Sequence, residues 1–160
     1  MSIERVREYF AKENIKASIM EFDASSATVE LAAQAVGCEP RRIAKTMACK
    51  INESAILVIT AGDAKVDNAK YKKQFGTKAK MVPVDELEAL VGHAIGGVCP
   101  FGINDGIVVY MDESLKRFTT VFPACGSANS AVEMTIPQLE EYAKITARVD
   151  VCKAWQAESM

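Results

Sequence analysis

Residues 44–62 have the sequence AKTMACKINESAILVITAG, which holds two apolar segments separated by the three residues INE. The second segment, residues 54–62, is a nearly continuous apolar run rich in β-branched side chains. Such a run is typical of a strand that is buried on both faces. We therefore expect residues 54–62 to form the central strand of the fold.

Helices and strands are expected on both sides of this strand. Apolar residues at helical spacing, capping residues and terminal glycines predict the helices, while short apolar or alternating segments predict the strands. The expected helices span residues 2–14, 28–37, 66–76, 84–92 and 135–146, and the expected strands span residues 18–22, 79–83, 106–112, 118–124, 130–135 and 147–151.

The order of these elements restricts the fold class. Three expected strands follow one another between residues 106 and 135, so the strict alternation of strand and helix that makes a doubly wound sheet is excluded. We expect an α/β fold of the mixed α+β type. It consists of a single compact domain over residues 1–160, with a curved mixed sheet or an open barrel flanked by helices.

Composition places the chain among ordinary globular proteins. Of its 160 residues, 49% are apolar and 25% are charged, which is close to the globular average. No apolar run approaches the roughly 20 residues that cross a bilayer, and the charged, amphipathic start is unlike a secretory signal. We expect a soluble, cytoplasmic protein without a membrane partner.

Five cysteines are scattered singly along the chain, without a CxxC pair. They are Cys38, Cys49, Cys99, Cys125 and Cys152. This spacing predicts reduced thiols instead of a disulfide framework. Because His93 is the single histidine, we expect no metal site. No sequence motif indicates a cofactor.

The charge pattern bears on nucleic-acid partners. A net charge of −2 argues against a protein that coats DNA or RNA non-specifically. Locally, however, six lysines lie between Asp63 and Lys80. Three of them, Lys70, Lys72 and Lys73, fall on the expected helix 66–76 and are candidates for weak contacts to a tRNA backbone. The alternative is an ordinary solvated helix face.

Residues 92–102, GHAIGGVCPFG, combine four glycines with His93, Cys99 and Pro100. The segment matches neither GxGxxG before a helix nor the GK[ST] of a P-loop. Three interpretations stay open. The first is a tight turn, and the second is a Cys99 nucleophile activated by His93. The third is a set of backbone N–H donors for a carbonyl oxygen or oxyanion, kept aimed by Pro100.

Several motifs together resemble the YbaK family, also known as the prolyl-tRNA synthetase editing domain family. GGVCPFG resembles its Gly-x-x-x-Pro loop, with Gly96 and Pro100 at the ends. CEPRRIAKTMACK resembles its strand with a lysine-threonine pair, here Lys45 and Thr46. ILVITAGDAKVDNAKYKKQFG resembles its central strand, glycine turn and helix, and ACGSANSAVEMT resembles its late glycine-containing turn. The order and spacing agree from about residue 20 to the last strand.

The resemblance implies a hydrolase that cleaves the ester between a wrong amino acid and the terminal adenosine of a tRNA, often the tRNA for proline. Without an attached synthetase, the chain resembles the free-standing members, which act in trans. Lys45 would hold the phosphate or sugar of the terminal nucleotide, and backbone N–H groups at Gly96 and Gly97 would hold the ester carbonyl and the oxyanion. The family's use of the substrate's own sugar hydroxyl accounts for the missing catalytic triad. Further substrate contacts are implied at Thr46, Val98, Cys99, Pro100, Phe101 and Gly126.

Cys99 departs from the family, many of whose members have serine or alanine before the loop proline. With Cys99 at this position, the sequence leaves open which amino acid the pocket accepts and which it excludes. The family's small pocket suits alanine or cysteine. Mischarged tRNA is the implied substrate, and a prolyl-tRNA synthetase or an elongation factor is the expected protein partner. Two other functions stay open: a non-catalytic module that binds tRNA ends or nucleotides, and a thiol enzyme that uses Cys99.

Overall fold

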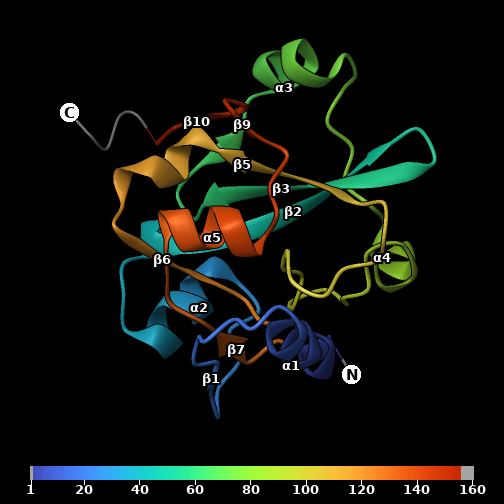
Figure 1. Cartoon of the computed structure of the whole chain (residues 1–160). Coiled ribbons are helices and arrows are strands. Elements are labelled where there is room, and N and C mark those ends of the chain that lie inside the picture. Colours follow the sequence, from blue (N-terminus) through green and yellow to red (C-terminus); the bar gives the residue numbers. More distant parts are fainter. Residues whose placement is uncertain (1, 156–160) are drawn as a thin grey trace.

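The computed structural model describes residues 2–155 of the 160-residue chain (Figure 1). The helices are α1 (Ser2–Lys12), α2 (Val29–Val36), the 3-10 helix η1 (Pro40–Arg42), α3 (Asn68–Phe75), α4 (Val84–Val91), the 3-10 helix η2 (Glu113–Arg117) and α5 (Ile136–Tyr142). The strands are β1 (Met20–Glu21), β2 (Ile43–Ile51), β3 (Ser54–Ala61), β4 (Lys65–Val66), β5 (Val108–Asp112), β6 (Thr120–Pro123), β7 (Ser130–Ala131), β8 (Met134–Thr135), β9 (Ala147–Val149) and β10 (Cys152–Lys153). Within residues 2–155, no helix has the length and apolar character needed to cross a bilayer.

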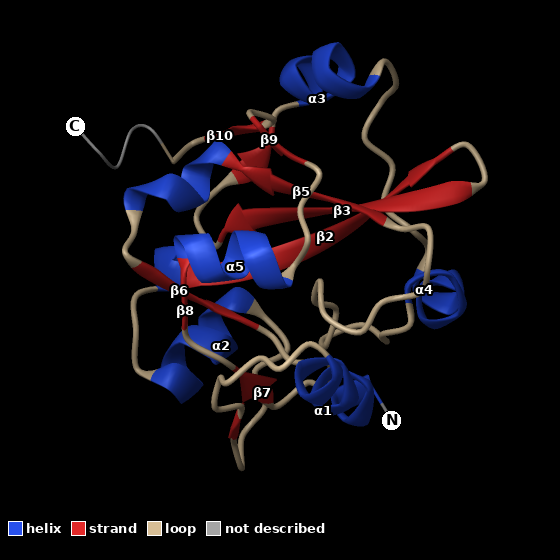
Figure 2. Ribbon diagram, in the orientation of Figure 1, coloured by secondary structure: helices blue, strands red, loops and turns tan. Residues whose placement is uncertain are grey.

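A six-stranded mixed sheet lies at the centre of the molecule, with the strand order β8-β6-β2-β3-β5-β9 (Figure 2). β2 and β3 pair antiparallel, which sets Lys45 opposite Thr60. β2 pairs in parallel with β6, β3 with β5, and β5 with β9. The expected fold class, a mixed α/β domain with a curved mixed sheet, is confirmed.

The apolar run 54–62 forms the central strand, as predicted. Leu57, Val58 and Ile59 of β3 have no exposed surface, because β2 and β5 cover both edges of the strand and side chains cover both of its faces. Figure 1 shows α3 at one end of the molecule and α1 and α2 at the other. The sheet therefore separates two distinct surfaces.

Capping residues set the ends of several helices. Thr28 caps α2 by accepting a hydrogen bond from the backbone N–H of Leu31 at 3.2 Å, and Thr135 and Gln138 form the capping box of α5. The helix expected from residue 66 begins at Asn68, because Asp67 is its N-cap. Residues 65–66 form β4 instead, paired with β10.

Most of the expected strands are shorter than predicted, and those at 79–83 and 130–135 differ most. In place of a strand at 79–83, Met81 forms a single bridge with Cys49, because Pro83 caps α4 directly afterwards. The strand expected at 130–135 is divided between two partners: β7 pairs with β1 and β8 pairs with β6. The division of residues 130–135 arises from tertiary pairing, which the local pattern does not encode.

Candidate active site

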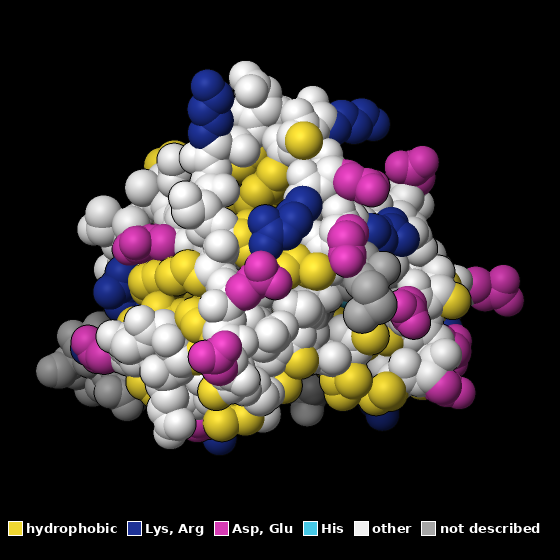
Figure 3. All heavy atoms as spheres, turned by 90° about the horizontal axis from the view of Figure 1, so that it is seen from below, with side chains coloured by type: hydrophobic (Ala, Val, Ile, Leu, Met, Phe, Trp, Pro, Cys, Tyr) yellow, Lys and Arg dark blue, Asp and Glu magenta, His cyan; other side chains and the backbone are white. Residues whose placement is uncertain are grey.

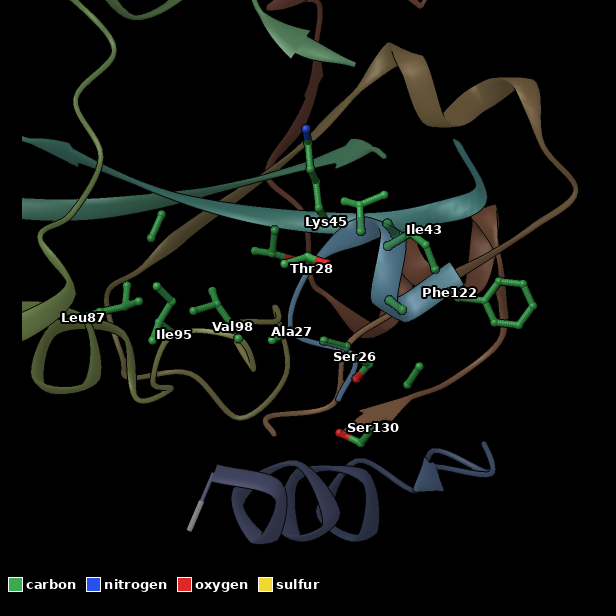
Figure 4. Close-up of a pocket in the computed structure, with 18 of the residues that line it drawn as sticks. Ser26, Ala27, Thr28, Ile43, Lys45, Leu87, Ile95, Val98, Phe122 and Ser130 are labelled. Carbon is green, nitrogen blue, oxygen red and sulfur yellow. The ribbon is translucent and has the colours of Figure 1, made fainter. Parts of the chain in front are cut away.

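A cavity of about 440 Å³ opens between the start of α2, strand β2, the start of α4 and the loop 95–98 (Figure 4). Most of its wall is apolar. Its lining includes Ser26, Ala27, Thr28, Val29, Lys45, Thr46, Met81, Val84, Ile95, Gly96, Val98 and Phe122. The structure therefore brings Lys45 and Gly96, which lie about fifty residues apart in the sequence, to one cavity.

Lys45 is half-buried on β2 and lines the cavity. Its Nζ donates to the carbonyl oxygen of Ala64 at 2.7 Å. Figure 4 shows the side chain extending away from Ile95 and Val98. Burial lowers the pKa of the Lys45 ammonium from its ordinary value, because a desolvated cation is less stable. An ammonium has three donors, so two remain for a ligand.

The loop 95–98 requires glycine at two successive positions. Gly96 has φ +89°, and an added Cβ would lie 3.3 Å from the Cβ atoms of both Ala27 and Ala128. A Cβ on Gly97 would lie 2.5 Å from the carbonyl carbon of Gly126, which is closer than any real contact. The backbone of Gly97 therefore packs directly against the turn that contains Gly126.

The loop also determines which backbone donors a ligand can use. The N–H of Gly97 donates to the carbonyl oxygen of Ala94 at 3.1 Å, so it is already engaged. In residues 2–155, no acceptor pairs with the N–H groups of Gly96 and Val98. Of the two donors expected from the sequence, the N–H of Gly97 is thus engaged and that of Gly96 is not, within the described residues, and the neighbouring Val98, which also lines the cavity, has a second unengaged N–H.

The second half of the glycine segment lies in the core. Phe101 has no exposed surface and meets the ring of Phe10 edge-on, with the centroids 5.2 Å apart. Cys99 is also fully buried, and Pro100 is buried. None of these three residues lines the cavity, and neither does Gly126. Of the substrate contacts implied by the resemblance, the structure places Thr46 and Val98 at the cavity wall.

His93 and Cys99 lie close together without forming a nucleophile and base. His93 Nε2 donates to the carbonyl oxygen of Phe101 at 2.6 Å, while Cys99 Sγ lies 3.6 Å from the same nitrogen. A carbonyl can only accept, so Nε2 carries the proton. Burial lowers the pKa of His93 and raises the pKa of Cys99 to about 12. The thiol stays protonated at neutral pH, which argues against a thiol enzyme.

The burial of Cys99 predicts a pattern of alkylation. Iodoacetamide at neutral pH should modify the half-buried Cys38 first and leave Cys99 unmodified in the folded protein, because the thiolate is the reacting form. Peptide mass spectrometry over a time course measures both sites in one sample. A Cys99 adduct that appears as fast as the Cys38 adduct, with loss of activity, would contradict this assignment.

The basic helix α3 does not join the cavity. It lies at the end of the molecule opposite α2 (Figure 1). Lys70 Nζ pairs with Asp150 at 3.1 Å and donates to the carbonyl oxygen of Cys152 at 3.0 Å, whereas Lys72 and Lys73 are exposed. Any contact from this helix to a tRNA is therefore remote from the cavity.

The sequence did not indicate that residues 26–29 and Phe122 form part of the cavity wall, with Ala27 directly against the loop at Gly96. It also missed an apolar rim at the cavity, made of Met81, Val84 and Ile95. These side chains are 55%, 61% and 64% exposed. Figure 3, viewed from the side of α1 and α2, shows apolar side chains in patches between acidic and basic ones. The available sequence signal was weak: large apolar residues beside turns, where no helix or strand face buries them.

The chain is similar in sequence to an editing domain and to two bacterial proteins. The family model described as the aminoacyl-tRNA editing domain matches residues 23–142. YwhH of Bacillus subtilis, an uncharacterized protein, is 48% identical over 157 residues, which is 98% of this chain and 100% of YwhH. EbsC of Enterococcus faecalis, described as a candidate Cys-tRNA(Pro)/Cys-tRNA(Cys) deacylase, is 26% identical over 109 residues, 67% of this chain and 66% of EbsC.

A solved structure has the same fold. It is a crystal structure of a candidate trans-editing enzyme for prolyl-tRNA synthetase, 28% identical to this chain, with a TM-score of 0.86. The superposition covers 96% of this chain and 98% of the other. The likeness therefore extends over nearly the whole length of both molecules.

Proposed function

The chain belongs to the aminoacyl-tRNA editing domain family, and we propose that it is a trans-acting aminoacyl-tRNA deacylase. The proposed substrate is tRNA for proline that carries a small wrong amino acid such as cysteine or alanine. One observation carries the proposal: Lys45 and the Gly96 loop, which come from distant segments, line the same cavity. The names given to EbsC and to the trans-editing structure support the substrate class.

The ester carbonyl is proposed to lie at the loop 95–98. The N–H groups of Gly96 and Val98 donate to its oxygen and stabilise the negative charge that develops there. The Lys45 ammonium stays on the Ala64 carbonyl and uses its remaining donors for the phosphate or sugar of the terminal nucleotide. The apolar rim of Met81, Val84 and Ile95 contacts the adenine base.

Water is activated by the substrate in this proposal. His93, the single histidine, is buried on the Phe101 carbonyl and lies outside the cavity wall. The free hydroxyl of the terminal ribose therefore orients the water. The water oxygen bonds to the ester carbon, the bond from that carbon to the ribose oxygen breaks, and a proton passes to the ribose oxygen.

A panel of charged tRNAs tests this function. tRNA for proline is charged with labelled alanine, cysteine, serine or proline, tRNA for cysteine is charged with cysteine, and the remaining ester is measured over time. We expect loss of the alanyl or cysteinyl ester from tRNA for proline, with the prolyl ester spared. Each methylene contributes about 10- to 200-fold of such discrimination. Binding of the tRNAs without turnover would instead identify a non-catalytic module.

The exposed lysines of α3 provide a separate prediction about tRNA affinity. The double variant Lys72→Glu/Lys73→Glu should bind all tRNAs more weakly, and the slope of log affinity against log salt should flatten by about 1 to 2. Fluorescence anisotropy at several salt concentrations measures this slope. The matched control is Lys12→Glu/Lys16→Glu, the same charge change at exposed residues at the other end of the molecule. Equal slopes for both double variants would show that α3 is only a solvated face.

A further inference from the structure

The partner of the Lys45 ammonium belongs to a tight turn after β3. The ammonium is held by the Ala64 carbonyl at 2.7 Å, and Ala64 itself is fully buried. The N–H of Ala64 donates back to the carbonyl oxygen of Ala61 at 3.1 Å. The direction of the ammonium therefore depends on how residues 61–64 are fixed.

An ion pair outside the cavity anchors this turn. The guanidinium of Arg117 binds the Asp63 carboxylate through two contacts, of 3.0 Å and 2.6 Å. The two side chains are only 15% and 21% exposed, so water and salt screen the pair less than an ordinary surface pair. A two-point contact of this kind fixes orientation as well as distance.

Arg117 is itself held in place. Its Nε donates to the carbonyl oxygen of Ser114 at 2.9 Å, and its guanidinium lies over the rings of Phe118 and Trp155, 4.7 Å and 5.0 Å from their centroids. The hydroxyl of Ser114 accepts from the N–H of Ala61 at 3.1 Å. The turn is thus attached to the segment around η2 at two points, Ala61 and Asp63.

We propose that Asp63 and Arg117 are positioning residues for Lys45: their ion pair fixes the turn whose Ala64 carbonyl directs the ammonium. The inference rests on the proposed function, because Lys45 is the residue through which the pair acts. Asp63 has a second effect through its charge. The Asp63 carboxylate lies in the same turn as the Ala64 carbonyl that accepts from the ammonium. Its negative charge favours the protonated amine of Lys45.

Four titratable groups surround Lys45 on neighbouring elements, and three of them carry a charge. Asp63 in the turn and Glu30 on α2 favour the ammonium, and Lys65 on β4 disfavours it. The Cys152 thiol on β10 is neutral, because burial raises its pKa. Burial of Lys45 lowers its own pKa, so loss of the Asp63 charge should lower that pKa further. If deacylation needs the protonated form of Lys45, activity is then lost at a lower pH than in the unmodified enzyme.

The test measures kcat and kcat/KM for deacylation against pH in Asp63→Asn and Arg117→Met. The alkaline limb is the fall in rate at high pH. In Asp63→Asn it should move to a pH that is lower by about half a unit or more. Arg117→Met leaves the Asp63 charge without its counterion, so the limb should stay or rise while kcat falls by about tenfold. Asp63→Glu should restore the limb. General damage to the fold would not lower the limb in Asp63→Asn while leaving it unchanged or raising it in Arg117→Met.

A matched control and a second readout keep the outcomes separate. Glu140→Gln breaks the ion pair of Glu140 with Arg148, which belongs to α5 and β9, and should leave the profile unchanged. Acetylation of Lys45 by acetic anhydride, followed by peptide mass spectrometry, measures its titration without activity. If Lys45→Ala is inactive but Asp63→Asn changes neither the alkaline limb of the pH profile nor the titration of Lys45, the role of the ion pair is overturned. The proposed function would then still stand. A fully active Lys45→Ala would overturn the proposed role of Lys45, and the acetylation titration would still test the ion pair.

Discussion

Gly96→Ala is expected to lower deacylation by about 100- to 1000-fold, the usual effect of losing one aimed donor at an oxyanion. Gly96 has φ +89°, which disfavours any residue with a Cβ. The new methyl group would also lie 3.3 Å from the Cβ atoms of Ala27 and Ala128. Relief of both strains rotates the N–H groups of the loop away from the ester. Single-turnover deacylation of one mischarged tRNA measures the loss.

Gly106→Ala is the matched control for this variant. Gly106 has nearly the same conformation, φ +87°, and an added Cβ meets nothing within 4 Å. The control therefore has the backbone strain without the crowding at the cavity, and we expect it to keep its activity. Cys99→Ala and Cys99→Ser should also keep most activity. An active Gly96→Ala beside an inactive Cys99→Ala would reverse the assignment of this loop.

Lys45→Ala is expected to fold normally and to lose about ten- to a hundred-fold in deacylation. A hydrogen bond to a charged group contributes about 1.5 to 3 kcal/mol, and each 1.4 kcal/mol is a factor of ten in rate. The side chain is half-buried and its partner is a backbone carbonyl, so its loss leaves no buried charge behind. Circular dichroism and thermal melting check the fold, and kcat/KM checks the function.

The control for Lys45→Ala is Lys50→Ala on the same strand. Lys50 pairs with Glu86 at 2.9 Å and does not line the cavity. Both variants remove one cation from β2, but only Lys45→Ala should impair deacylation. Equal losses in the two variants would mean that the charge of the strand, and not the placement of Lys45, determines the rate.

The sequence predicted the main sheet and several helix ends because these depend on local chemistry. The apolar run 54–61 is compatible with few structures other than a buried strand. Thr28 and Thr135 cap their helices through hydrogen bonds to residues three positions further along the chain. The segments at 79–83 and 130–135 could not be assigned in the same way. Their hydrogen bonds go to strands that are distant in the sequence, so the pairing partner decides how many residues form a strand.

From the sequence, the residues of the candidate site could be predicted only where they belong to a family motif. Lys45 and Gly96 were identified through the family resemblance, but the cavity wall at 26–29 and Phe122 forms only when α2 and β6 meet β2. Cys99 and Phe101 show the converse. Cys99 lies inside the Gly-x-x-x-Pro segment and Phe101 directly follows it, yet both side chains are buried in the core. Phe101 packs there against the ring of Phe10. Sequence proximity to a functional loop does not determine the side on which a residue is buried.

The central claim is that this cavity supplies backbone donors and one ammonium, and leaves the activation of water to the substrate. The most direct measurement is single-turnover deacylation of a mischarged tRNA for proline whose terminal adenosine lacks the free ribose hydroxyl, beside the same tRNA with the hydroxyl. We expect the rate to fall by about 100-fold or more while the affinity stays the same. An equal rate with both tRNAs would contradict the claim and would require a base from the protein itself.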